Sequence, residues 1–121
     1  MTEQNTHRLI DLNPDEFLFH EGDRSENIYL VQEGSLRVFR FDTIQGFIEL
    51  AIVNPNQLVG EMAFFDSAPR SASVQAITPV KLIELNVDIL RTHLEEQPKW
   101  LKILIETMLG HIRRLNKKAV F

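Results

Sequence analysis

The stretch LVGEMAFFDSAPRSASVQA, residues 58 to 76, decides how this chain is interpreted. It places one carboxylate, Glu61, directly after Gly60 in an apolar run, and one guanidinium, Arg70, nine residues later. A surface salt bridge between the two charges would contribute at most about 1 kcal/mol. A bound ligand would use them differently, because a carboxylate accepts hydrogen bonds from hydroxyls and an arginine fork binds anions. The stretch therefore predicts either an ion pair or a site for a nucleotide or sugar phosphate.

Length and composition limit the class of protein. The 121 residues suffice for one domain with its own core, and 44% hydrophobic and 25% charged residues are typical of globular proteins. The chain has no cysteine, which excludes disulfides and thiolate metal sites and agrees with a cytoplasmic location. We expect no membrane span, because no run of eighteen apolar residues occurs. The net charge of −4 argues against direct nucleic-acid binding, which needs a broad positive field.

Short strand patterns separated by turn signals fill the first two thirds of the chain. Alternating or β-rich runs occupy residues 16–22, 27–34, 35–42, 47–54, 73–78 and 80–86. Runs at this spacing predict an antiparallel sandwich or barrel. In the second run, Tyr29 is expected to pack in the core with its hydroxyl at an edge.

The hydrophobic period changes after Asn86, which is a good N-cap for a helix over 87–96. Pro98 then opens a second predicted helix over 98–118. This second helix carries a heptad seam formed by Leu101, Ile105, Met108, Ile112 and Leu115. Further apolar residues lie off the seam, namely Trp100, Ile103, Leu104 and Leu109. We therefore expect one contact with the β-domain, with Trp100 as a buried anchor, and a second contact with another protomer.

Residues 60–76, GEMAFFDSAPRSASVQA, resemble the phosphate-binding cassette of the cyclic-nucleotide-binding domain family. The family pattern is Gly-Glu-x-Ala, a short variable stretch, then Pro-Arg, a small residue, Ala and Ser/Thr, and every position is filled. FLFHEGDRSENIYLVQEGSLRVF, residues 17–39, is similar to another signature of this family. The resemblance extends over the whole chain, 1–121. It implies an antiparallel jelly-roll-like β-roll (a double-stranded β-helix) over about 9–86, followed by two α-helices.

The resemblance also implies ligand contacts residue by residue. Glu61 would accept a hydrogen bond from the ribose 2′-hydroxyl, and Arg70 would pair with the cyclic phosphate. The main-chain N–H groups of Ala63 and Ser71 would also reach the phosphate, and Gly60 would lie near the ribose. The remaining implied ligand-binding positions are Ala51, Val59, Met62, Ala72 and Val74. Candidates for capping the base from the last helix are Thr107, His111 and Arg114.

The function implied by the resemblance is that of a regulatory module without catalytic activity or cofactor. It would bind cAMP or cGMP. At the position of Ser71, family members with alanine tend to prefer cAMP and those with threonine cGMP, and serine there is found in bacterial cAMP receptors, so the resemblance favours cAMP. Binding would be relayed through the last helix to a partner protomer in a homodimer, or to an output domain. Transcription regulators of this family continue into a helix-turn-helix, so the chain is either free-standing or a piece of a longer protein.

One departure from the family pattern lies just before the cassette. Asn56-Gln57-Leu58-Val59 stands where the family usually has Gly-Asp/Glu-x-Phe. Asparagine tolerates the left-handed conformation better than other non-glycine residues, so we expect Asn56 to preserve this turn.

Three alternatives remain at this point. The main one is a β-roll that has lost nucleotide binding and serves for dimerisation or docking, although such family members usually lack the Glu or the Arg. A metal-dependent cupin-type enzyme would share the barrel, but the histidines never form His-x-His: His7, His20, His93 and His111. Acid–base catalysis by Glu61 with Asp66 has no support beyond the two carboxylates.

Overall fold

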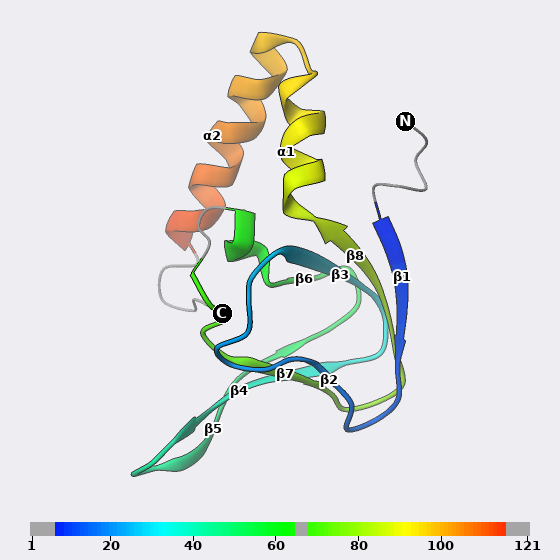
Figure 1. Cartoon of the computed structure of the whole chain (residues 1–121), viewed down its shortest axis with the longest axis vertical. Helices are drawn as coiled ribbons and strands as arrows, with labels where there is room; N and C mark the ends of the chain where they lie inside the picture. Colours follow the sequence, from blue (N-terminus) through cyan, green and yellow to red (C-terminus); the bar gives the residue numbers. More distant parts are fainter. Residues whose placement is uncertain (1–6, 65–67, 116–121) are drawn as a thin grey trace.

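The computed structural model describes residues 7–64 and 68–115, which form an antiparallel β-roll followed by two helices (Figure 1). One four-stranded sheet has the order β1-β8-β3-β6, and the other has the order β2-β7-β4-β5. The first sheet contains β1 (His7–Leu12), β8 (Val80–Asn86), β3 (Asn27–Glu33) and β6 (Leu58–Val59). The second contains β2 (Phe17–Phe19), β7 (Ser73–Ala76), β4 (Leu36–Asp42) and β5 (Gly46–Val53). This architecture confirms the predicted fold class.

The predicted strand runs each contain a strand, but two features differ from the prediction. Strand β2 ends at Phe19, because a turn follows in which the Asp23 carboxylate accepts a hydrogen bond from the His20 amide at 2.9 Å. Strand β1 was not among the predicted runs. It pairs antiparallel with β8 along its whole length, so its partner rather than its own alternation makes it a strand.

The main hydrophobic core is built from residues of both sheets. Its residues without exposed surface are Val31, Leu36, Val38, Val59, Val74 and Leu82. Burying each such side chain contributes about 1.5–3 kcal/mol relative to leaving it in water. A second, smaller cluster consists of Ile28, Ala63 and Val87, with Phe64 and Leu90 packed against it. This second cluster joins the β-roll to the first helix.

The two helices, α1 (Val87–Glu95) and α2 (Lys99–Leu115), stand side by side above the β-roll (Figure 1). Asn86 is the N-cap of α1, as predicted, because its side chain accepts a hydrogen bond from the Ile89 amide. Lys102 Nζ lies 2.6 Å from Glu95 Oε2 and ties α2 to α1. Residues 116–118 of the predicted second helix lie outside the described residues. Among the residues that are described, no helix is long and apolar enough to cross a membrane.

The predicted heptad seam of α2 is matched only in part: Leu101 and Ile105 belong to it, Leu109 does not, and the side chains of Ile112 and Leu115 lie outside the described ones. Leu101, Ile105 and Leu109, each four residues apart, line a cavity toward the β-roll. Met108, a predicted seam residue, is 55% exposed. The prediction of Trp100 as a buried anchor is wrong, because this side chain is 67% exposed. One residue corresponds to about 100° of rotation, so Trp100 lies well away from the face occupied by Leu101.

Candidate functional site

The cassette, residues 60–76, begins where β6 ends and the chain turns into the 3₁₀ helix η2 (Glu61–Phe64). Gly60 has φ +76°, a conformation that favours glycine. The Ala63 amide donates to the Gly60 carbonyl at 3.1 Å and closes the turn. A helical turn after Gly60 is therefore confirmed. The N–H that the resemblance assigns to a phosphate is already engaged within this turn.

Arg70 is buried and held at both its side chain and its main chain. Its side chain is 7% exposed. Nη1 donates to the Gly60 carbonyl at 3.2 Å, and Nη2 donates to the Asn27 carbonyl at 2.6 Å. The Arg70 amide donates to the Asp23 carbonyl, and the Arg70 carbonyl accepts from the Gly22 amide, both at 2.8 Å. The guanidinium is thus preorganised by main-chain groups.

Two aromatic rings lie next to the Arg70 guanidinium. Its Cζ is 4.1 Å from the centroid of Phe19 and 5.9 Å from that of Tyr29. Such cation–π contacts stabilise the charge. Burial nevertheless lowers the pKa of Arg70 from its usual value, which the neighbouring Tyr29 partly offsets. The buried Nε has no hydrogen-bond partner within the described part of the chain, so this N–H is available to an anion.

Gly60 is also required by the position of Arg70. A Cβ built on Gly60 would lie 2.5 Å from Arg70 Nη1 and 3.2 Å from Arg70 Cζ. Atoms at that separation cannot coexist without one of them moving. The glycine therefore makes room for the guanidinium as well as allowing the turn, a packing role that the spacing of the motif did not reveal.

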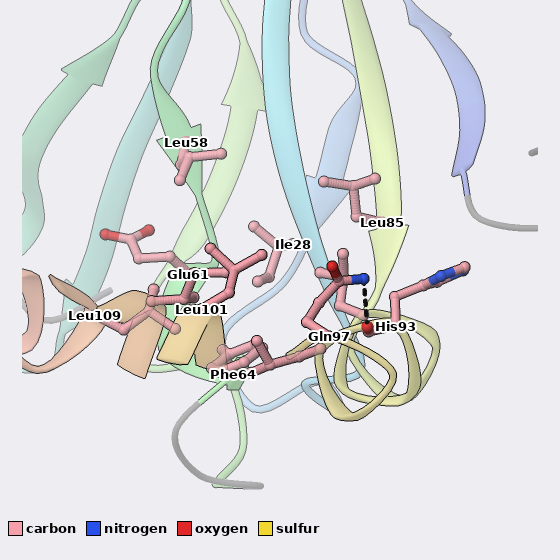
Figure 2. A pocket seen from close by; sticks show the side chains of 12 residues that line it. Ile28, Leu58, Glu61, Phe64, Leu85, His93, Gln97, Leu101 and Leu109 are labelled. Carbon is pink, nitrogen blue, oxygen red and sulfur yellow. Dashed lines mark hydrogen bonds between the residues drawn. The ribbon is translucent and has the colours of Figure 1, made fainter. Parts of the chain in front are cut away.

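Glu61, the first residue of η2, is half-buried. Burial raises the pKa of this carboxyl, against the opposing effects of its own backbone amide and of the charge on Arg70. Figure 2 shows Glu61 at the edge of a group of apolar side chains, on the opposite side from His93 and Gln97. A carboxylate in this setting accepts hydrogen bonds and cannot donate them.

The apolar side chains in Figure 2 enclose a cavity of about 490 Å³ between the two helices and the β-roll. Its walls are Ile28, Leu58, Phe64, Leu85, Leu90, Leu94, Leu101, Ile105 and Leu109, with Glu61, His93 and Gln97 as the polar exceptions. Arg70 is not among the lining residues. The cavity therefore shares Glu61 and Phe64 with the cassette, but no arginine or lysine among the described residues lines it.

Several predicted site residues lie in the main core. Val59 and Val74 have no exposed surface, and Ala72 is 1% exposed. Ala51 on β5 and Val74 on β7 both stand opposite Val38 of the intervening strand β4. These residues form the floor of the β-roll beneath the cassette, and their contact with a ligand stays a prediction.

The remaining predicted residues are more exposed. Met62 and Ser71 are half-buried within the cassette. The candidates for capping the base are exposed on α2: Thr107, His111 and Arg114. Among the described residues, no hydrogen bond or ion pair joins these three side chains to Arg70; Thr107 Oγ1 donates to the Ile103 carbonyl instead. Asp66 lies outside the described residues.

Two residues beside Arg70 were not predicted as part of the site. Tyr29 is 6% exposed, which confirms its expected place in the core. Its ring lies next to the Arg70 guanidinium, and burial raises the pKa of its hydroxyl, with a further contribution from Glu84. The sequence holds no signal for Asn27, because its main-chain carbonyl is what binds Arg70, and every residue has such a group.

The comparison with protein families identifies the class to which this architecture belongs. The family described as "Cyclic nucleotide-binding domain" matches residues 9–97, which is most of the chain. The chain belongs to this family. No group of three or more residues able to hold a metal ion occurs within the described ranges 7–64 and 68–115.

Individual relatives agree with this membership. The chain is 26% identical over 107 residues to the CRP-like cAMP-activated global transcriptional regulator of Mycobacterium tuberculosis, covering 88% of this chain and 48% of the relative. The chain thus spans about half the length of that relative. It also resembles the N-terminal domain of a transcriptional regulator from Streptomyces coelicolor A3(2), with a TM-score of 0.79, 30% identity, and coverage of 98% and 82% of the two chains.

A third similar protein is the EAL enzyme Bd1971, whose solved structures include a cAMP-bound and a cGMP-bound form. The cAMP-bound form has a TM-score of 0.67 and 28% identity, covering 90% of this chain and 29% of that chain. The cGMP-bound form has a TM-score of 0.68 and 27% identity, covering 93% and 30%.

Proposed function

We propose that this chain is a regulatory module that senses a cyclic nucleotide, with cAMP as the favoured ligand, and that it performs no catalysis itself. The observation that carries the proposal is the Arg70 guanidinium, which is buried, preorganised by main-chain carbonyls and left with an available Nε–H. A buried cation with an unused donor is costly without an anion, so an anionic ligand would stabilise this arrangement.

Arg70 and Glu61 would recognise different parts of the nucleotide. The phosphate of a cyclic nucleotide would bind Arg70 through charge-assisted hydrogen bonds, which are stronger than neutral ones. Glu61 lies at the start of η2, nine residues before Arg70, and would accept a hydrogen bond from the ribose 2′-hydroxyl. Loss of either partner would leave a buried polar group unsatisfied, which explains why a ligand would need both a phosphate and a hydroxyl.

The choice of nucleotide rests on one residue and on the relatives. Ser71 follows Arg70, at the position where family members that carry threonine tend to favour cGMP. The relative from Mycobacterium tuberculosis is named as cAMP-activated, and Bd1971 has been solved with cAMP and with cGMP. These observations support cAMP as the first ligand to test and cGMP as its comparison.

The relay to the helices would pass through the smaller hydrophobic cluster. Ala63 and Phe64 of η2 belong to the same cluster as Val87 and Leu90 of α1. Arg91 of α1 donates a hydrogen bond to the Phe64 carbonyl, and its guanidinium lies 5.2 Å from the centroid of the Phe64 ring. A ligand that tightens the cassette would therefore move α1. It can shift this equilibrium only by the difference between its affinities for the two states.

The output of the relay would be a contact made by α2. Four large apolar side chains of this helix are about half exposed or more: Trp100, Ile103, Leu104 and Met108. A partner protomer or an output domain that covered these residues would sense the position of α2. Exposed apolar surface of this kind is a common feature of interaction sites.

Calorimetric titration with cAMP and with cGMP tests the proposal, using the wild-type chain and Arg70→Ala. The matched control is Arg37→Ala, because Arg37 is an arginine of the same β-roll that pairs with Glu49 at 3.3 Å outside the cassette. We expect binding to the wild type and to Arg37→Ala, with affinity near the micromolar range, about −8 kcal/mol, and loss of binding in Arg70→Ala. Equal binding by both variants would contradict the proposal.

A docking module that binds no nucleotide is the second candidate function, and the exposed apolar face of α2 favours it. In that case neither nucleotide would give a heat of binding or raise the melting temperature. Sedimentation of the ligand-free chain would then show a dimer that dissociates when Met108, which is 55% exposed, is replaced by glutamate. A monomer without nucleotide affinity would exclude both nucleotide sensing and self-association through α2.

A further inference from the structure

Asn27 lies between the anion receptor and the first helix. It is the first residue of β3 and stands opposite Asn86, the last residue of β8. Its main-chain carbonyl accepts the 2.6 Å hydrogen bond from Arg70 Nη2. Its side-chain Oδ1 accepts a hydrogen bond from Asn86 Nδ2 at 3.4 Å. One residue therefore contacts the receptor through its main chain and the start of α1 through its side chain.

Asn86 uses both ends of its carboxamide. Nδ2 donates to Asn27, while Oδ1 accepts from the Ile89 amide at 3.1 Å and caps the first turn of α1. A main-chain bond runs beside this link, because the Val87 amide donates to the Glu26 carbonyl at 3.0 Å. An aspartate would cap the helix as well as asparagine does, but it could not donate to Asn27. Asparagine at position 86 can therefore both cap α1 and donate to Asn27.

The hydrogen bond between Asn27 and Asn86 is partly shielded from water. Asn27 and Asn86 are both half-buried. Tyr29 lies on the same strand as Asn27, and its ring centroid is 5.9 Å from Arg70 Cζ, so a second contact connects the start of β3 to Arg70. Hydrogen bonds that are partly shielded from water are stronger than exposed ones, and they polarise one another.

We propose that Asn27 and Asn86 form a polar bridge that couples the state of the Arg70 guanidinium to the N-cap of α1. An anion that binds Arg70 competes with the Asn27 carbonyl for the Nη2 protons. When that bond weakens, the start of β3 is released from Arg70, and the paired carboxamides carry the change to the Ile89 amide. Both asparagines are positioning residues, because they act on α1 rather than on the ligand. The identity of the anion rests on the proposed function, but the bridge itself does not.

The ligand-free arm of the test uses NMR of the ¹⁵N-labelled chain, with the Ile89 amide as the reporter. Replacing Arg70 by lysine removes the forked donor and should shift the Ile89 resonance in the wild-type background. In the Asn27→Ala background the same replacement should shift it at least about threefold less, as expected when a coupling residue is removed. An equal shift in both backgrounds would overturn the proposal whether or not any nucleotide binds.

The second arm is measured at saturating cAMP, so that changes in affinity do not enter. We expect cAMP to shift the Ile89 amide in the wild type and in Asn54→Ala, a control that removes a side-chain bond to Ser35. The shift should fall at least about threefold in Asn27→Ala and in Asn86→Asp, which keeps the cap but loses the donor to Asn27. Undiminished shifts in these variants would refute the bridge while the proposed function stands.

If cAMP does not bind, the proposed function fails, and the ligand-free arm alone decides the bridge. If Asn27→Ala does not fold, Asn86→Asp takes its place in both the ligand-free and the cAMP-saturated measurements.

Discussion

Replacing Gly60 by alanine tests how the anion receptor is assembled. The new Cβ would lie 2.5 Å from Arg70 Nη1, at a residue whose φ is +76°. The left-handed backbone alone costs alanine about 1 kcal/mol of folding free energy. Displacing the Arg70 guanidinium, which is bonded to two carbonyls, costs about 1–3 kcal/mol more. We therefore expect Gly60→Ala to lower the free energy of unfolding by about 2–4 kcal/mol.

Gly46→Ala is the matched control for this prediction. Gly46 has a similar φ of +78°, but a Cβ there would meet no atom within 4 Å, so only the backbone cost of about 1 kcal/mol applies. Urea denaturation followed by circular dichroism measures both losses. In an Arg70→Ala background, Gly60→Ala should cost no more than Gly46→Ala. Equal losses for the two glycines, or an unchanged Gly60→Ala loss without Arg70, would show that Gly60 does not make room for the guanidinium.

The remaining predictions concern the carboxylate, the core and the ribose. Burial raises the folded-state pKa of Glu61, so the ionised carboxylate destabilises the folded chain. Glu61→Gln should therefore raise the melting temperature at neutral pH. This gain should vanish as the pH falls below 4.5, the ordinary pKa of a glutamate side chain. A gain that grows on acidification would contradict the sign. Leu82→Ala, in a side chain without exposed surface, should cost about 2–5 kcal/mol in urea denaturation, whereas Leu9→Ala, 68% exposed, should cost about 0.5 kcal/mol or less. Removing the 2′-hydroxyl from cAMP should weaken calorimetric binding to the wild type at least about tenfold, but should have no further effect in Glu61→Ala; equal weakening in both would exclude this role for Glu61.

The sequence predicts those parts of the fold in which the type of a side chain depends directly on its local structure and burial. The alternating runs record strands with one buried face, and Leu36 and Val38 of β4 are indeed without exposed surface. Asn86 caps α1 through its own side chain. Asn56 adopts φ +69°, as expected for the asparagine that replaces a turn glycine.

The parts that the sequence did not predict depend on partners distant in the chain. Strand β1 exists because β8 pairs with it. Trp100 was expected to be buried, but hydrophobicity alone does not say which face of α2 meets the β-roll. The motif indicated Arg70 as an anion receptor, yet its carbonyl partners at Gly60 and Asn27 have no sequence signature, since every residue carries a carbonyl.

The Arg70 Nε–H resonance is a direct probe of whether Arg70 receives the phosphate of a cyclic nucleotide. This buried group has no hydrogen-bond partner among the residues described here, so an arriving phosphate oxygen should shift it strongly. In a chain labelled with ¹⁵N-arginine, the signal is assigned as the one that disappears in Arg70→Lys. We expect cAMP to move this resonance in proportion to the fraction bound by calorimetry. Saturable binding of cAMP with a stationary Arg70 Nε–H would show that the phosphate binds elsewhere.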